Sequence, residues 1–108
     1  MFVRTIRHGL DIVEEVDSPA LRLLADVYHS AVSSESIEVA FGSRIGLVAE
    51  VQVADFEGRH EPGTGSIDWQ AVMSQLRRAG YAGDIGLECF PSMPIDASLA
   101  LTRRTLGL

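Results

Sequence analysis

Three oxygen-bearing side chains, Asp26, Gln52 and Glu88, lie in or directly after three short apolar segments of the chain. In a parallel α/β sheet, ligands bind at the carboxyl ends of the strands. If the apolar segments are strands of one such sheet, the three side chains meet at the same edge. Carboxylate and amide oxygens are the ligands that hard cations such as Mg²⁺ and Mn²⁺ prefer. A single carboxylate at a strand end is more often a helix cap or a loop anchor. The prediction of a metal site therefore rests on finding three such groups on three successive strands.

Basic side chains follow the same apolar segments. His29 comes soon after the first, and Arg59 and His60 lie in a Gly- and Pro-rich loop after the second. An arginine in such a loop can bind a substrate carboxylate or phosphate through its fork of donors, and a solvated arginine is the alternative. Cys89 directly follows Glu88 and should point away from it, because side chains alternate along a strand.

The elements that must position these groups are one helix followed by three rounds of strand and helix. Apolar runs and turn residues predict strands at 21–25, 50–54 and 84–89, and helices at about 3–16, 33–48, 68–80 and from Pro94 onward. Strands that alternate with helices predict a parallel sheet of βαβ units. The sequence therefore predicts an α/β fold.

Two of the predicted helices carry specific expectations. Ser33 or Ser34 would cap the helix that begins there. The last helix would bury one apolar face, formed by Ile95, Leu99, Thr102 and Leu106. Trp69 shares helical spacing with other apolar residues, so we expect it in the core.

Composition excludes several classes of partner. The chain of 108 residues has a net charge of −6, which argues against nucleic acid, since phosphate binding needs a basic face. No apolar run approaches the roughly 20 residues that span a membrane. The single cysteine cannot form an internal disulfide, which favours a reducing cytoplasm. We therefore expect neither nucleic acid nor a membrane as the main partner.

Four segments carry a resemblance to a known family. Residues 23–29 (LLADVYH), 51–55 (VQVAD), 58–65 (GRHEPGTG) and 80–88 (GYAGDIGLE) resemble, in order and with compatible spacing, segments of the hydroxypyruvate isomerase family. That family belongs to the xylose-isomerase-like (β/α)₈ TIM barrels. The resemblance covers about residues 12–91, and the GRHEPGTG run is its most specific part.

The resemblance implies a divalent metal held by four side chains. Asp26, Gln52 and Glu88 match three of the four metal-ligand positions, and Mg²⁺ or Mn²⁺ is the expected ion. Glu88 would also be catalytic, as one of two glutamates that move a proton between neighbouring carbons through an enediolate. The named family interconverts hydroxypyruvate and tartronate semialdehyde in this way.

The resemblance also implies substrate contacts. His29 and Arg59 match positions that contact substrate in related barrels, and His60 lies beside them. Two positions depart from the family pattern: Ser66 stands where a glutamate is usual, and Cys89-Phe90 replaces a more usual tyrosine. We expect the serine to alter a contact within the loop or at a helix cap, and not the reaction itself.

A full barrel has eight strands and about 250 residues, so we expect residues 1–108 to be a C-terminal fragment of one. Its three strands would be the sixth to eighth, and the strand with the fourth ligand would precede them. Open edges and an uncovered inner face predict either a homo-oligomer or a need for the missing half.

Three functions stay open at this point. The first is the isomerase, and the second is a non-catalytic remnant or interaction module. The third is another enzyme of the same barrel group, such as a ketose 3-epimerase. A DNA-repair endonuclease of this group fits less well, because it would use zinc, several histidines and a basic surface.

Overall fold

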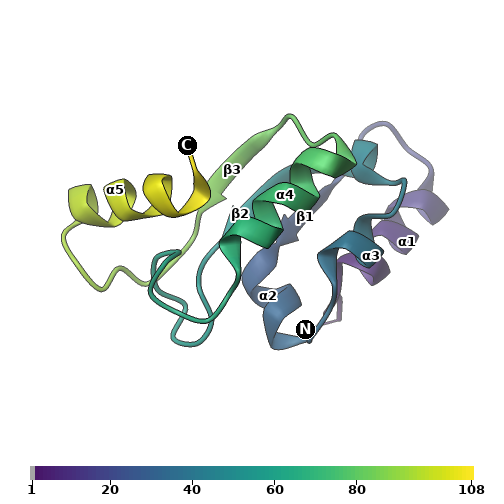
Figure 1. Ribbon diagram of the computed structural model, residues 1–108. Coiled ribbons are helices and arrows are strands. Elements are labelled where there is room, and N and C mark those ends of the chain that lie inside the picture. Colours follow the sequence, from purple (N-terminus) through teal and green to yellow (C-terminus); the bar gives the residue numbers. More distant parts are fainter. Residues whose placement is uncertain (1) are drawn as a thin grey trace.

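The computed structural model describes residues 2–108, in which helices alternate with strands (Figure 1). The strands β1 (Leu23–Asp26), β2 (Val48–Val53) and β3 (Asp84–Leu87) form one parallel sheet in the order β1-β2-β3. The helices are α1 (Ile6–Val16), α2 (Val27–Val32), α3 (Ile37–Phe41), α4 (Trp69–Ala79) and α5 (Ile95–Leu106), with a 3₁₀ turn η1 (Ile45–Leu47) before β2. The predicted α/β class with three parallel strands is confirmed.

The register of the sheet separates its two faces. Ala25 pairs with Val51, and both are buried in the core. One residue further along, Asp26 pairs with Gln52, and Gln52 pairs with Gly86. Because successive side chains on a strand point to opposite faces, Asp26 and Gln52 lie on the face away from the core.

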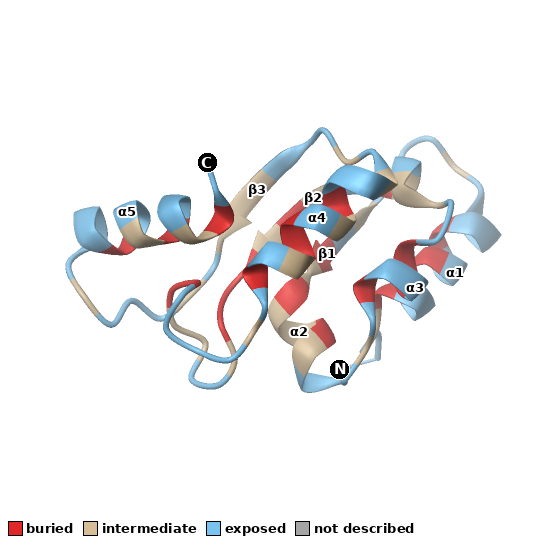
Figure 2. Cartoon of the chain, in the orientation of Figure 1, coloured by how far each residue is buried: buried red, intermediate tan, exposed pale blue. Residues whose placement is uncertain are grey.

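Helices cover only one face of the sheet. Leu10 of α1, Phe41 of α3 and Leu76 of α4 are almost fully buried in one apolar cluster with β2 residues such as Val51. Figure 2 shows each of these helices with buried residues on one side and exposed residues on the other. Such amphipathic helices are stabilised mainly by packing, because short isolated helices are marginal in water. None of the helices in residues 2–108 is long and apolar enough to cross a membrane.

The ends of α4 follow the expected capping chemistry. The Asp68 side chain accepts a hydrogen bond from the amide of Ala71 at 3.0 Å, as a helix N-cap does. Gly80 ends the helix with φ of +84°, a left-handed conformation that suits glycine. Trp69, the first residue of α4, is 4% exposed, as predicted for a core residue.

The predicted helix over residues 33–48 is wrong. Only α3 forms there, with Ser36 as its N-cap rather than Ser33 or Ser34. Gly42 ends α3 at φ of +51°, and the chain then turns through η1. Ser33 instead closes α2, a helix that we did not predict. The cap of α2 is Asp26, so a residue predicted for a site also starts a helix.

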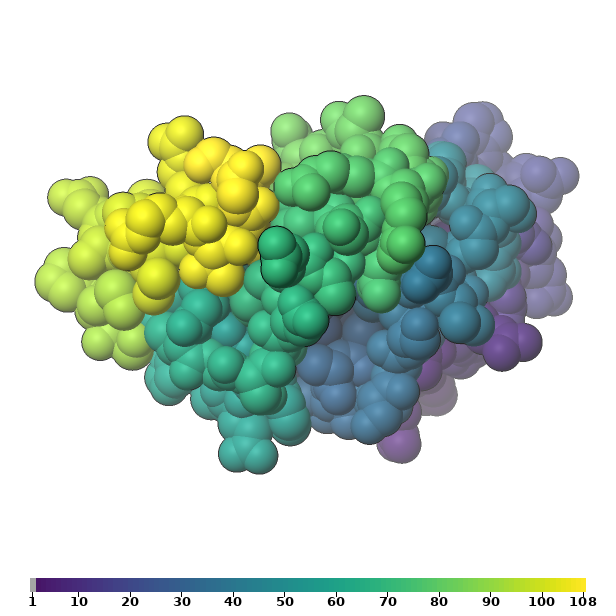
Figure 3. All heavy atoms as spheres, in the orientation of Figure 1, coloured from purple at the N-terminus to yellow at the C-terminus, as the bar shows by residue number. Residues whose placement is uncertain are grey.

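The predicted buried face of α5 is only half right. Thr102 and Leu106 are buried together with Ser98, whereas Ile95 and Leu99 are 58% and 45% exposed. In Figure 3, α5 (yellow) packs beside α4 (green) at one end of the molecule. The helix therefore has a neighbour along one side only, and its other apolar side faces outward.

Candidate functional site

The three predicted ligand positions lie at one edge of the sheet. Asp26 ends β1 and is in register with Gln52 of β2, which is in register with Gly86 of β3. Glu88 lies two residues beyond Gly86, so it belongs to the same face. Its amide donates to the carbonyl oxygen of Val53 at 3.1 Å, which continues the sheet pairing past the end of β3. The strand predicted to reach Cys89 thus ends at Leu87, and Glu88 stands at its carboxyl end.

The two carboxylate oxygens of Asp26 have different partners. Oδ1 accepts the amides of Tyr28 at 2.9 Å and His29 at 3.3 Å, which caps α2. Oδ2 faces the His29 ring, with Nε2 at 3.6 Å, and the Arg59 guanidinium, with Nη2 at 3.7 Å. The Asp26 side chain is only 14% exposed. One oxygen therefore positions the carboxylate, and the other is presented to the site.

Arg59 joins the two predicted ligand carboxylates. Its Nη2 atom lies 3.4 Å from Oε2 of Glu88 as well as 3.7 Å from Oδ2 of Asp26. The Glu88 side chain is 57% exposed, and Arg59 is 24% exposed. The same nitrogen thus brings a positive charge between two carboxylates from different strands.

The Arg59 guanidinium also lies over aromatic rings. Its central carbon is 5.0 Å from the centre of the Tyr28 ring and 5.9 Å from that of Phe90. These distances fit cation–π contacts. Arg59 has φ of +59°, and its backbone is held by hydrogen bonds with Asp55 (3.1 Å) and Phe90 (2.7 Å). The backbone of Arg59 is anchored, while its guanidinium lies among two carboxylates and two aromatic rings.

Gln52 has an acidic neighbour on the same face. Its amide nitrogen donates to Oε1 of Glu50 at 3.4 Å. A Cβ at position 86 would lie 2.6 Å from the same Glu50 oxygen, so a larger residue there would displace the flexible Glu50 side chain. The amide oxygen of Gln52 is the atom that could bind a cation, and Glu50 adds negative charge nearby.

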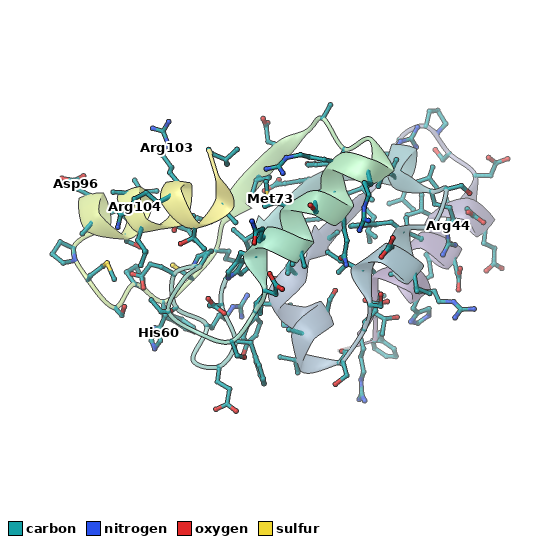
Figure 4. All side chains as sticks on the ribbon, viewed as in Figure 1. Arg44, His60, Met73, Asp96, Arg103 and Arg104 are labelled. Carbon is teal, nitrogen blue, oxygen red and sulfur yellow. The ribbon has the colours of Figure 1, made fainter. Side chains whose placement is uncertain are left out.

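His60 is held within the loop. Its Nδ1 lies 2.7 Å from the carbonyl oxygen of Phe90. A carbonyl only accepts, so Nδ1 carries the proton in this contact. The ring lies close to Gly58, where a Cβ would meet Nε2 at 2.9 Å. In Figure 4, His60 lies among the loops below α5. Its predicted contact with substrate stays a prediction.

A buried carboxylate organises the loop that carries Arg59 and His60. Asp55 has no exposed surface, and its oxygens accept the indole N–H of Trp69 at 2.9 Å and the amide of Gly63 at 2.8 Å, among others. Burial alone would raise the pKa of Asp55, but these hydrogen bonds outweigh it and leave the pKa below its usual value. Asp55 is therefore a fixed anion that holds the loop.

A second buried carboxylate ties this loop to the segment after β3. Glu61 is fully buried, and Ser92 donates to it from its amide at 2.8 Å and from its hydroxyl at 2.7 Å. The Ser92 hydroxyl is the main reason that the pKa of Glu61 falls from 4.5 to about 2. The chain around Arg59 and the chain that follows Glu88 are thus held together.

Ser66, which departs from the family pattern, still makes a loop contact. Its amide and its hydroxyl both donate to the carbonyl oxygen of Phe56, at 2.6 Å and 2.7 Å. Ser66 therefore stabilises the loop that contains Arg59.

Sequence reasoning missed several residues that shape this site. Tyr28 and Phe90 flank the Arg59 guanidinium, and Asp55 and Glu61 support its loop. The available signal for the two acids was their position in a loop rich in glycine and proline between two apolar segments. Nothing in the sequence distinguishes these two acids from solvated loop carboxylates, and their burial was decided by the tertiary structure.

The donor set fits a hard divalent cation only in part. Among residues 2–108 there is no group of three or more His, Cys, Asp and Glu side chains arranged to hold a metal ion. Two carboxylates do converge, however, and a guanidinium already supplies a positive charge between them. The groups that could hold a metal are the carboxylates of Asp26 and Glu88 and the amide oxygen of Gln52. Further ligands would be needed to complete the coordination of the ion.

A parallel sheet with helices on one face and acidic groups at its carboxyl edge is the arrangement of part of a (β/α) barrel. The chain belongs to the family described as xylose isomerase-like TIM barrel, which residues 1–105 match.

Several relatives within this fold are named isomerases or epimerases. A putative hydroxypyruvate isomerase of Streptomyces coelicolor is 36% identical over 70 residues, which are 65% of this chain and 25% of that protein. The crystal structure of an E. coli 3-keto-D-glucoside 4-epimerase superposes with a TM-score of 0.80 at 27% identity, over 94% of this chain and 40% of that one. Other relatives are named 2-oxo-tetronate isomerase and L-ribulose 3-epimerase.

One structural neighbour contains a metal. The IOLI protein, 20% identical with a TM-score of 0.77 over 95% of this chain and 42% of that one, was crystallised with a zinc atom. Members of this fold can therefore bind a divalent metal. The chain spans between about a quarter and two fifths of the length of these relatives.

Proposed function

We propose that this chain contributes to a metal-dependent isomerase that acts on a small hydroxy-keto acid. The observation that carries the proposal is the convergence of Asp26, Arg59 and Glu88 at the carboxyl edge of the sheet. The names of the relatives support an isomerase or epimerase. The specific reaction proposed is the interconversion of hydroxypyruvate and tartronate semialdehyde.

Each residue has a defined part in the proposed reaction. Asp26, Gln52 and Glu88 would hold the cation, Mg²⁺ or Mn²⁺, which when bound polarises the oxygens of the substrate. Glu88, the most exposed of the charged side chains at the site, would be one of two glutamates that move a proton from the hydroxyl-bearing carbon to the carbonyl carbon, while the hydroxyl proton passes to the former carbonyl oxygen. Arg59 would bind the substrate carboxylate, with His29 and His60 beside it.

The test is a proton-exchange and isomerase assay on hydroxypyruvate with Mg²⁺ or Mn²⁺. In the assembled protein, we expect exchange of the substrate proton with solvent in the wild type, and its loss in Glu88→Gln. Glu15→Gln, on the exposed side of α1, is the matched control and should keep the activity. Equal activity in wild type and Glu88→Gln would remove Glu88 from the proposed mechanism.

The second candidate is a ketose 3-epimerase. The L-ribulose 3-epimerase of Mesorhizobium japonicum is 29% identical over 98 residues and aligns with 91% of this chain, a larger share than the isomerase relative does. An epimerase would return the proton to the same carbon from the opposite side. Incubation with L-ribulose distinguishes the two, because only an epimerase would change the configuration at its third carbon without forming an aldose.

The proposed activity also requires a further polypeptide. The sheet of residues 2–108 has β1 and β3 at its edges, and edge strands present unpaired backbone groups. Beside β1 lies a groove of about 390 Å³, lined mainly by apolar side chains of α1 and β1 such as Ile12, Leu23 and Leu24. We propose that either a second copy or the rest of a barrel covers these edges, in the cytoplasm.

Sedimentation velocity at several concentrations tests the assembly. We expect a concentration-dependent oligomer, or a monomer that gains activity only when a barrel half is supplied. A non-catalytic remnant would be folded yet inactive under both conditions, and that result would refute the isomerase and the epimerase together.

A further inference from the structure

We propose that Arg59 is an internal cation that competes with the divalent metal for the same two carboxylates, and that metal binding displaces its side chain. This rests on the metal site of the proposed function. The starting observation is that one nitrogen, Nη2, lies within 3.7 Å of Asp26 Oδ2 and 3.4 Å of Glu88 Oε2.

The competition is for particular atoms. Oδ1 of Asp26 is occupied by the amides of Tyr28 and His29, which leaves Oδ2 as the oxygen that both cations need. A divalent ion of the expected kind binds carboxylate oxygens at about 2.0–2.1 Å. A guanidinium within 4 Å of those oxygens would then lie close to a doubly charged ion. Coulomb repulsion between the two cations at such a distance weakens the binding of each when the other is present.

The contact of Arg59 with the carboxylates is weak enough to be exchanged. Both distances exceed the roughly 2.7–2.9 Å of a charge-assisted hydrogen bond, and a single nitrogen serves both carboxylates. Partly exposed ion pairs of this kind contribute little to stability. Arg59 therefore offsets the repulsion between Asp26 and Glu88 without binding either tightly.

An alternative position for the displaced side chain lies beside it. The Phe90 ring is 65% exposed, an unusual state for a large aromatic side chain, and its centre is 5.9 Å from the guanidinium carbon. The Tyr28 ring is 5.0 Å away. Because Phe90 also bonds to the Arg59 backbone, the ring and the arginine stay together when the side chain moves. Only rotation about side-chain bonds is needed.

The inference is tested by titrating Mn²⁺ into the metal-free protein, followed by isothermal calorimetry or by the loss of the free-ion electron paramagnetic resonance signal. We expect Arg59→Met to bind Mn²⁺ about tenfold more tightly than the wild type, since a nearby like charge is removed. Arg103→Met on the exposed side of α5, which projects away from His60 in Figure 4, is the matched control and should not change the affinity.

Thermal unfolding without metal gives a second readout. Arg59→Met should unfold at a slightly lower temperature than the wild type, because the small stabilisation of the two carboxylates by a cation is lost, and Mn²⁺ should reverse the difference. If Arg59→Met does not fold without metal, Arg59→Lys decides the question: it keeps the competing charge and should bind Mn²⁺ like the wild type, and a tenfold gain would contradict the inference.

Unchanged or weaker Mn²⁺ affinity in Arg59→Met overturns the inference, as does the absence of Mn²⁺ binding in every variant. The titration measures binding and not turnover. A protein that shows the expected affinities but leaves hydroxypyruvate and L-ribulose unchanged would refute the proposed function and leave the role of Arg59 intact.

Discussion

Ser92 donates two hydrogen bonds to Glu61, from its amide at 2.8 Å and from its hydroxyl at 2.7 Å, and so links the chain that follows β3 to the loop that follows β2. Glu61 lies two residues from Arg59, and Ser92 lies four residues from Glu88. The relative position of the arginine and the glutamate at the site therefore depends on a carboxylate that takes no part in the chemistry.

Glu61→Gln should weaken this link. One of the two carboxylate oxygens that accept hydrogen bonds from Ser92 would become an amide nitrogen, which cannot accept. The pKa of Glu61 is about 2 in the folded protein and 4.5 ordinarily, so its ionisation stabilises the fold fully above pH 4.5. That contribution is lost as the pH falls from 4.5 to about 2. The stability difference between wild type and Glu61→Gln should shrink over this range.

Urea unfolding at a series of pH values measures the difference. Other acids, such as Asp55, titrate in both proteins and largely cancel in the comparison. A difference that stays constant from pH 7 down to pH 2 would show that the charge of Glu61 does not stabilise the fold.

Trp69→Phe should destabilise the protein by about 1–3 kcal/mol, because it leaves a buried carboxylate without one of its donors. The indole N–H donates to Oδ2 of Asp55 at 2.9 Å, and the apolar ring volume is largely kept. The sequence contains one tryptophan, so the variant has no tryptophan fluorescence, and its unfolding should be followed by circular dichroism. A double-mutant cycle with Asp55→Asn should show coupling, and purely additive effects would argue against the bond.

Gly65→Ala should destabilise the protein by about 1–3 kcal/mol, the usual cost of overpacking. A Cβ at this position would lie 2.6 Å from Oδ1 of Asp55 and would also overlap the carbonyl oxygen of Phe56. Gly46→Ala is the matched control, because no atom lies within 4 Å of a Cβ built there. Thermal melts that rank the two variants in the opposite order would contradict the loop packing.

Leu106→Ala should cost about 2–5 kcal/mol, whereas Leu99→Ala in the same helix should change stability by no more than about 0.5 kcal/mol. Leu106 is 2% exposed and belongs to the core cluster, and Leu99 is 45% exposed. Chemical denaturation of both variants checks which side of α5 is packed. A large loss in Leu99→Ala would mean that an additional polypeptide covers that face.

Several parts of the fold could be predicted because they depend on neighbours along the chain. Asp68 and Gly80 delimit α4 through bonds that span three or four residues, so the sequence alone indicates both ends. The alternation of strands and helices predicts the parallel sheet. The same alternation places Asp26, Gln52 and Glu88 at one edge, since strands in a parallel sheet all end on the same side.

Other parts depend on contacts between distant segments. Ile95 and Leu99 have the same spacing as Thr102 and Leu106, and only the packing against α4 and the loop around Gly63 decides which side of α5 is buried. Ser36 caps α3 for a nearer reason, because the residues just before it already form α2 and its end.

By itself, the sequence determined the class of fold, the family and the edge of the sheet where the polar groups gather, because strand periodicity and local capping are encoded in short spans. Only the tertiary structure decided that Arg59 lies between Asp26 and Glu88, and that Glu61 is buried against Ser92. Those pairs lie about 30 residues apart in the chain. Their meeting follows from the way the loops pack over the strand ends, which no local pattern specifies.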